Sequence, residues 1–572
     1  MERRLLLVFA LTFLVIVLFQ PLLKKYLPQP STPPGQTQNQ VPAQPLPAGN
    51  LGEVTRAKTA ATATGATKQA ASESDIVVEN GLYRITFTNR GAQVKSWVLK
   101  KFQDDQGAPL DLVNNAAAQR YGYPLSLWTY DEDLRDKLNS GLYVSSRSGA
   151  LNAPGEITFE WADQDLVVRK SFRFDDTYVV QVESSVSSKG STVSAFPAWP
   201  AGFGDQTTAA GYHASQIEYQ HDSSTQRLEI KKVSSGNTVP GPFNWAALTD
   251  AYFAAVFIPD NPQDVSLVTL HNSIAIPKDP QKPNTNETTP ADVLGVAVGS
   301  SRGETSTRLF VGPKALQLLE SVAVPTIQND HQDLRGLVNF GTFGIIARPL
   351  FVWLRWTYNL PFVHNWGWAI VLQTLIITVA LLPLRISSMK SALKMQKIQP
   401  QMTSIKEKYK KYGMRDPRRQ EMNTEIGALM KSEGVNPVGG CLPLIIQLPF
   451  IWAYYRMLGS AIELRQAHWL WIHDLSSRDP LFLLPILLVI SMVATQRMTP
   501  QAGMDPAQQK MLNWMMPLMM GFIFFNLAAG LNLYYAESNL IAIAQQAVMN
   551  RTSMGREMRE IALKRARKKE KK

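Results

Sequence analysis

The sequence predicts a multi-pass α-helical membrane protein of about six spans, joined to a large all-β domain on the exported side. The composition is mixed: 45% of the 572 residues are apolar and 18% are charged, yet the mean hydropathy is only -0.11. Apolar runs long enough to cross ~30 Å of hydrocarbon lie at the start of the chain and in its last third. Between them, apolar and polar residues alternate with the period of β-strands.

Two basic segments carry the whole surplus of positive charge, which is +12 for the chain. Residues 387–436 hold 11 Lys/Arg and 5 Asp/Glu, a balance of +6, and residues 551–572 hold 10 and 3, a balance of +7. The other residues therefore sum to -1. This distribution argues against a basic nucleic-acid-binding domain and is typical of cytoplasmic loops between spans. The single cysteine, Cys441, excludes a disulfide framework and a cysteine-based metal cluster.

Residues 1–25 are expected to form a transmembrane anchor, because an apolar run follows Arg3 and Arg4 and so starts inside. A cleavable signal peptide is the alternative, but no small-x-small cleavage site follows the run. Residues 26–75 are rich in Pro, Gln, Thr, Ala and Gly and are expected to form a disordered linker.

Residues 76–335 are expected to form the all-β sandwich, since segments such as 83–88 and 166–174 alternate apolar and polar side chains between turn residues. This region lacks the Gly-x-Ser-x-Gly, His-Glu-x-x-His and phosphate-loop patterns. We therefore expect no enzyme activity, no catalytic residues, no cofactor, no metal and no small-molecule substrate. His468 and His473, five residues apart, are expected to be interfacial or capping residues rather than metal ligands.

Residues 338–362 contain many aromatics but also Arg348 and Arg355, and are expected to form an amphipathic helix on the outer membrane surface. If this segment crossed the membrane, the charge bias of the later loops would be inverted. Five further spans are expected in a core of residues 366–550, at 366–386, 437–458, 481–497, 510–526 and 529–549. With the anchor they make six crossings, which place both termini in the cytoplasm.

The loop 387–436 contains helix-forming residues on either side of a break near Gly413 and Pro417. This pattern predicts a cytoplasmic antiparallel helical hairpin, with a solvated, charged connector as the alternative. Residues 551–572 are expected to form a basic cytoplasmic tail.

Polar residues are frequent inside the expected spans. Most of them are amides or hydroxyls: Gln373, Thr374, Thr378, Gln447, Asn526, Asn532, Ser538, Asn539, Gln545 and Gln546. Each one taken alone is explained by hydrogen bonding between helices, whereas the set indicates a hydrated cavity open to one side. Glu537 is the sharpest signal, because an intramembrane carboxylate is costly and usually functional; the alternative is a protonated, packed side chain.

Several segments resemble one family. The most specific are Asn339-Phe-Gly-Thr-Phe-Gly, Asn436-Pro-x-Gly-Gly-Cys, Leu464-Arg-Gln-Ala, Asp505-Pro-x-Gln-Gln-Lys510 and Leu533-Tyr-Tyr-x-x-Ser-Asn-Leu540, with Asn89-Arg-Gly a looser match in the exported part. They resemble the YidC/Oxa/Alb membrane protein insertases, in the long form of bacteria with two membranes.

This resemblance implies a β-supersandwich in the periplasm and a five-helix core in the inner membrane, with a hydrophilic groove open to cytoplasm and lipid. It implies an insertase and chaperone for nascent membrane proteins, acting alone or beside the Sec translocon. The hairpin, with Lys394, Lys397, Lys406 and Lys410, is implied to receive clients, and the basic tail to contact ribosomes. No nucleotide or metal is implied, and membrane lipids are the remaining partners.

The resemblance also implies a set of client-contacting groove residues: Thr374, Thr378, Arg385, Gln447, Leu448, Pro449, Asn532, Tyr534, Tyr535 and Glu537. One departure stands out, since the family usually places an arginine where this chain has Thr378. Arg385 lies about two turns, ~10 Å, toward the cytoplasm and can replace it only in part. Glu537 stands where the family commonly has an apolar residue. We hypothesise that this groove attracts clients by hydration and polar contacts more than by a central cation.

Two other classes of function are considered. A transporter or channel using the same polar residues is expected to show repeat symmetry between half-bundles, and we find none. A structural assembly factor is the third class, in which the β domain binds partners and the spans only anchor it. Deleting the β domain separates this class from an insertase, which is expected to keep much of its activity.

Overall fold

The computed structural model describes residues 67–570 apart from 105, 223, 279–286, 327–331, 413–415, 436–441 and 499–505. The expected anchor 1–25 and residues 26–66 of the expected linker lie outside the described residues. The end of that linker is described and pairs with the β region, since the backbone of Lys68 bridges to Ala162.

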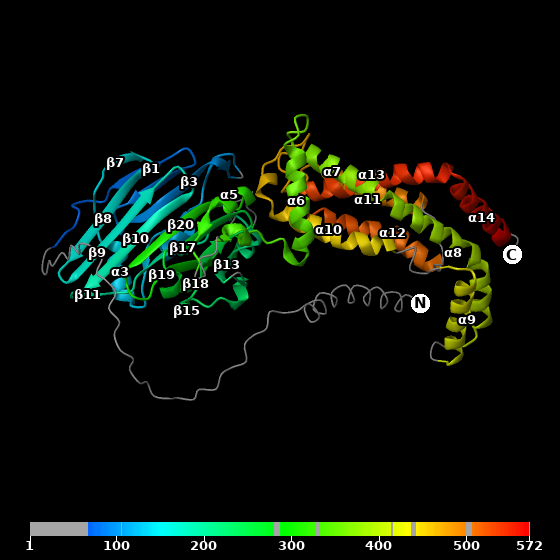
Figure 1. Cartoon of the computed structure of the whole chain (residues 1–572), viewed down its shortest axis with the longest axis horizontal. Helices are drawn as coiled ribbons and strands as arrows, with labels where there is room; N and C mark the ends of the chain where they lie inside the picture. Colours follow the sequence, from blue (N-terminus) through cyan, green and yellow to red (C-terminus); the bar gives the residue numbers. More distant parts are fainter. Residues whose placement is uncertain are drawn as a thin grey trace, which may run out of the picture. The chain divides into compact units, whose positions relative to one another are not determined.

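The described strands between β1 and β22 form three large sheets and one short pair (Figure 1). The first sheet has the order β4 (Pro109–Asp111), β3 (Gln93–Gln103), β2 (Tyr83–Thr88), β1 (Asp75–Glu79) and β7 (Gly149–Asn152). The largest has the order β14 (Ser224–Leu228), β13 (Gln216–His221), β16 (Trp245–Thr249), β17 (Phe253–Pro259), β20 (Thr305–Pro313), β10 (Val179–Ser188), β9 (Leu166–Phe174), β8 (Gly155–Asp163) and β6 (Val144–Ser145), with β11 (Ser191–Thr192) beside β10. The third has the order β15 (Asn237–Pro240), β18 (Val265–Pro277), β19 (Thr288–Ser300), β12 (Phe196–Trp199) and β5 (Leu127–Trp128).

The short pair is β21 (Ala323–Val324) with β22 (Gln332–Asp333), and most pairings within the sheets are antiparallel. Short helices connect the strands: α2 (Asn115–Tyr121), α3 (Glu132–Ser140), α4 (Ala209–His213) and α5 (Leu316–Ser321). The architecture confirms the prediction of a large β-sandwich.

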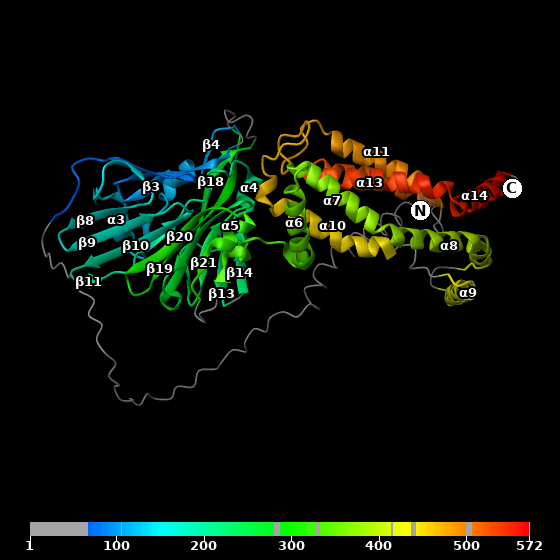
Figure 2. The same cartoon turned by 45° about the horizontal axis from the view of Figure 1, so that its top comes forward.

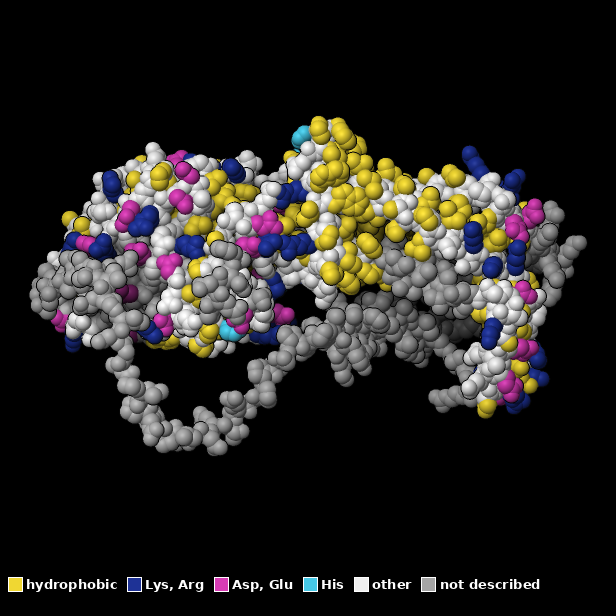
Figure 3. All heavy atoms as spheres, in the orientation of Figure 1, with side chains coloured by type: hydrophobic (Ala, Val, Ile, Leu, Met, Phe, Trp, Pro, Cys, Tyr) yellow, Lys and Arg dark blue, Asp and Glu magenta, His cyan; other side chains and the backbone are white. Residues whose placement is uncertain are grey.

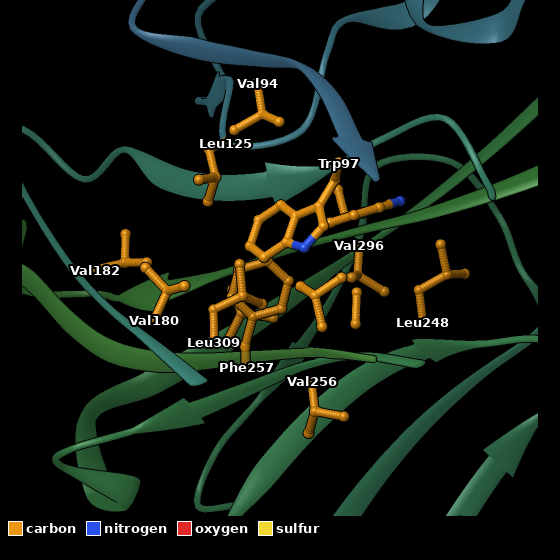
Figure 4. Close-up of a cluster of buried hydrophobic side chains, with 14 of the residues drawn as sticks. Val94, Trp97, Leu125, Val180, Val182, Leu248, Val256, Phe257, Val296 and Leu309 are labelled. Carbon is orange, nitrogen blue, oxygen red and sulfur yellow. The ribbon is translucent and has the colours of Figure 1, made fainter. Parts of the chain in front are cut away.

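The sandwich core explains why these segments form strands. In β9, Val168 and Phe172 point inward while Arg169 and Arg173 point to solvent, which is the alternation that the sequence shows. The strands of the largest sheet pack against the first sheet around the fully buried Trp97 (Figure 4).

Lys170 is among the ionisable side chains that are buried in the β domain. Lys170 of β9 points inward, and its Nζ donates to the carbonyl oxygens of Gly91, Ala92 and Leu125 at 2.8, 2.9 and 2.7 Å. All three acceptor residues have a positive φ, of 65°, 45° and 65°. The lysine therefore links two tight turns whose backbone has a positive φ, a conformation that residues other than glycine rarely adopt.

The last third of the described chain is helical (Figures 1 and 2). Its helices are α6 (Gly344–Tyr358), α7 (Trp366–Ala380), α8 (Leu382–Lys408), α9 (Arg418–Ser432), α10 (Leu442–Ser460), α11 (Leu483–Met498), α12 (Pro506–Phe524), α13 (Ala529–Arg551) and α14 (Ser553–Glu570). Helix α13 packs against α7 and α11, and both views show α6 running across the direction of α7 and α13. The expected amphipathic segment 338–362 is shorter as a helix, because a separate 3₁₀ turn, Gly341–Phe343, precedes α6.

The expected span 366–386 is interrupted at Leu381, where α7 and α8 meet at an angle of 47°. Pro383 lies in the first turn of α8, where its missing N–H is tolerated. Taken singly, none of the helices among the described residues is long and apolar enough to cross a membrane; the bent pair of α7 and α8 passes that test together. Two shorter apolar helices are α11 and Asn513–Phe524 of α12. The number of spans stays a prediction.

Beyond Leu381, α8 continues into a pair with α9. Their facing sides share a small apolar cluster that includes Ile398, Met402 and Ile426. Lys408 reaches Glu425 across the pair, and Lys394 reaches the carbonyl of Gly434, so the two helices run in opposite directions.

Candidate functional site

A polar network lies inside the helical bundle, where α7, α10 and α13 meet. The hydroxyl of Tyr454 donates to Oε1 of Gln373 at 2.5 Å, and Nε2 of Gln373 donates to the carbonyl of Leu350 in α6 at 3.0 Å. The ring of Tyr454 stacks on Tyr534 with centroids 4.2 Å apart. Gln373 and Tyr454 are fully buried, so these bonds replace the water that both groups have lost.

The two threonines of the predicted groove lie on α7, one turn apart. Thr374 is fully buried and donates to the carbonyl of Ile370, and Thr378 is half-buried and donates to the carbonyl of Thr374, both at 2.7 Å. Each hydroxyl hydrogen therefore points back along its own helix, which leaves the hydroxyl oxygen as an acceptor.

Arg385 is brought close to Thr378 by a residue of α13. Its Nη1 donates to Oε1 of Gln545 at 2.9 Å, and Nε2 of Gln545 donates to the backbone carbonyl of Thr378 at 3.3 Å. Gln545 thus links both sides of the break at Leu381 to α13. The guanidinium is half-buried and directed toward α13 instead of extending along α8 away from the bundle.

Glu537 lies on α13, two turns before Gln545, and its side chain is half-buried. Its Oε2 is buried and has no hydrogen-bond partner within the part of the chain that the structure describes. A buried carboxyl oxygen without a partner is costly, so the site favours a bound water or a donor from another molecule.

Three other predicted groove residues lie at the start of α13. Asn532 is fully buried, and its Nδ2 donates to the carbonyls of Phe524 and Leu527 at 3.0 and 3.3 Å, which closes the turn between α12 and α13. Tyr534 is buried in its stack, and the half-buried Tyr535 packs edge-on against Phe524. Asn532 therefore has a structural contact that the sequence does not reveal.

The remaining predicted groove residues belong to α10. Leu448 is exposed and Pro449 is half-buried within the helix, while the side chain of Gln447 lies outside the described residues.

The four hairpin lysines lie on α8 or just after it, and all are exposed. Lys397 differs from the others, because its Nζ lies 2.6 Å from Oε1 of Glu557 in α14. Lys406 and Lys410 extend from the distal half of the hairpin.

Sequence reasoning missed the role of Tyr454 and of Gln545. Gln545 carried a signal as a polar residue within an apolar segment, but nothing in the sequence pairs it with Arg385. Tyr454 lies in an aromatic-rich run of α10, and aromatic rings at helical spacing are usually packing residues.

Within the described ranges, no three His, Cys, Asp or Glu side chains lie close enough together to hold an ion. The rings of His468 and His473 contact each other with centroids 5.1 Å apart.

Two family models match this chain. The model described as YidC periplasmic domain matches residues 75–353, and the model described as 60Kd inner membrane protein matches residues 358–557. The first match ends at residue 353 and the second begins at residue 358, so the boundary lies in the last turns of α6.

Curated relatives match along most of the chain. A membrane protein insertase YidC from Cupriavidus necator is 32% identical over 86% of this chain and 86% of its own length. One from Syntrophus aciditrophicus is 29% identical over 96% of this chain and 100% of its own. A crystal structure of an active YidC insertase aligns over 86% of this chain and 95% of its own, at 20% identity and a TM-score of 0.34.

Proposed function

The chain belongs to the YidC family of membrane protein insertases, and from that premise we propose that it inserts and helps to fold integral proteins of the bacterial inner membrane. The observation that carries the proposal is the 32% identity to an insertase over 86% of the chain. Its substrates are nascent membrane proteins, which it receives alone or from the Sec translocon. It is not an enzyme.

The proposed topology has six spans, with both termini and the hairpin in the cytoplasm and the β-sandwich in the periplasm. The two basic segments support this orientation, because positive loops stay inside. Exposed apolar side chains support the lipid contact: Trp514, Leu518 and Phe522 repeat every four residues on one face of α12. Side chains of this kind also cover much of the helical region in Figure 3.

The proposed mechanism uses the polar groups of α7, α8 and α13 as a hydrated path for the polar part of a client. Moving an unpaired polar group into hydrocarbon costs several kcal/mol, so a path with water and hydrogen-bond partners lowers the barrier. The unpartnered Oε2 of Glu537 and the half-buried guanidinium of Arg385 supply an acceptor and a set of donors. We place client contacts at these two residues and at Thr378, Leu448 and Tyr535.

The cytoplasmic elements are proposed to bring clients to this path. Lys394, Lys406 and Lys410 offer exposed positive charge on the hairpin, and the tail from 551 to 572 offers more for the ribosome. Lys397 connects the two, because it pairs with Glu557 of α14.

The first test is protease protection of a small single-span client, synthesised with liposomes that contain only the purified protein. Protection well above that of empty liposomes is the expected result. If folded, correctly oriented protein gives no gain, the chain acts only with a translocon or as an assembly factor. Removal of residues 76–335 is expected to leave much of the insertion, whereas an assembly factor that works through its β domain loses its activity.

The second test addresses the path itself with Thr378→Ala and Glu537→Gln. Both are expected to reduce insertion of clients with polar tails more than insertion of clients with apolar tails. The controls are Thr192→Ala and Glu304→Gln, which change the same residue types at exposed positions of the β domain. If both groove variants insert every client like the controls, the polar contacts of the groove have no role in client attraction.

A further inference from the structure

Helix α6 turns an apolar face outward that no described segment covers. Ile345, Val352 and Trp356 are 86%, 55% and 59% exposed, and they recur at the spacing of one helical face. The opposite face is buried against the bundle through Ala347, Leu350, Phe351, Leu354 and Thr357. A helix with this much exposed apolar surface is expected to contact another protein or a membrane.

The exposed face contains a shallow pocket of about 560 Å³ with a cation at its rim. Its lining residues are Arg348, Pro349, Val352, Trp353 and Trp356. Nη2 of Arg348 lies 3.6 Å from Oε1 of Glu320, which also faces Arg335 at 3.8 Å. A guanidinium has five N–H donors, so a single loose contact leaves Arg348 free to bind an additional anion.

The surroundings of the pocket identify the partner as lipid. Figures 1 and 2 show α6 crossing the direction of α7 and α13, so α6 lies along the bilayer surface if those helices cross it. Figure 3 shows hydrophobic side chains over α6 that continue onto the adjoining helices. Tryptophan rings prefer the level of the lipid headgroups, and arginine pairs with phosphate through parallel N–H bonds.

We infer that this pocket binds an anionic phospholipid, with its phosphate on Arg348 and the upper part of an acyl chain along Val352 and Trp356. The inference rests on the proposed topology, in which α7 and α13 cross the membrane, but it does not depend on the insertase activity. Since the lipid fills an uncovered apolar face, it attaches α6 to the membrane surface at the end of the bundle.

The test uses the full-length protein in nanodiscs that contain phosphatidylglycerol with a photoreactive group near the headgroup end of one acyl chain. After irradiation, mass spectrometry measures lipid adducts on the peptide that contains residues 345–356. We expect adducts on this peptide, and Arg348→Gln is expected to lower them about fivefold, the effect of one basic residue at an anionic surface. Arg348→Lys keeps the charge and is expected to retain most of the label.

The matched control is Arg302→Gln, since Arg302 is also an exposed arginine paired with one carboxylate, that of Asp264 at 3.0 Å. This variant is expected to label like the parent protein. The proposal is overturned if the peptide takes no label or if Arg348→Gln labels it as strongly as the parent does. A phosphatidylcholine probe that labels the peptide equally well overturns the preference for an anionic headgroup.

Discussion

The buried ammonium of Lys170 predicts an unusual dependence of β-domain stability on pH. Burial lowers the pKa of Lys170 from 10.5 to about 7, while its three carbonyl acceptors oppose that shift by favouring the charged form. Because the folded pKa is below the unfolded one, the unfolded chain binds more protons between about pH 7 and 10.5. The stability contributed by this residue therefore rises with pH across that window and is lost as the pH falls toward 7.

The magnitude follows from the linkage between protons and folding. Each pH unit inside the window changes the free energy of unfolding by about 1.4 kcal/mol, so moving from about pH 7.5 to about pH 9 adds about 2 kcal/mol. In a domain of this size that corresponds to a Tm increase of about 4 to 8 °C. Lys170→Met removes the titrating group and, with it, this part of the pH dependence.

The assay is thermal unfolding of the full chain in detergent, followed by intrinsic fluorescence at both pH values, for the parent protein and Lys170→Met. The Tm of the parent minus that of the variant is expected to be larger at the higher pH. Lys101→Met, on the exposed face of β3, serves as the control for the general effect of pH. An equal Tm difference at the two pH values refutes the reasoning and means that the carbonyls keep the ammonium charged.

Three further predictions concern the helical region. Tyr454→Phe leaves Oε1 of Gln373 without its donor and is expected to cost about 1 to 2 kcal/mol, which a double-mutant cycle with Gln373→Leu measures in thermal unfolding; additive effects contradict the bond. Reversing the charge of Lys397 or of Glu557 is expected to expose α14 to protease, and reversing both to restore protection, although a half-exposed pair contributes less than about 1 kcal/mol. Asp479→Ala removes the bonds that its carboxylate accepts from the Trp471 indole and from the backbone N–H groups of Leu481 and Leu484, which join the preceding loop to the start of α11. It is expected to cost about 1 to 2 kcal/mol with faster cleavage of residues 461–482; unchanged cleavage contradicts this role.

The sequence predicts the β-sandwich well, because a strand that is half-buried shows its alternation directly. Arg169 and Arg173 occupy outward positions of that alternation. Lys170 occupies an inward position, and nothing in the sequence pattern explains a basic side chain there. What holds Lys170 there is a set of backbone carbonyls from turns about 45 to 79 residues away. Contacts of that kind depend on the folded backbone and leave no periodic signal.

The sequence predicts only part of the candidate site, because some contacts of the site also depend on the folded backbone. Glu537 is visible because a carboxylate is rare within an apolar segment that is expected to span a membrane. The contact of Gln545 with Arg385 is not visible, because it depends on the interruption at Leu381, which an apolar run conceals. Hydropathy averages over a window and so reports a continuous span where the helix axis changes direction.

The interruption at Leu381 also makes α8 a lever, in which a small movement near the joint becomes a large movement at the far end. Helix α8 has 27 residues and so extends about 40 Å, whereas Gln545 holds it within one turn of its start. A rotation of about 10° at the joint moves the far end by about 7 Å and the anchored end by about a tenth of that. Any load on the tip of the hairpin therefore acts with a long arm on the hydrogen bonds of Gln545 and, nearer the tip, on the ion pair of Lys397 with Glu557.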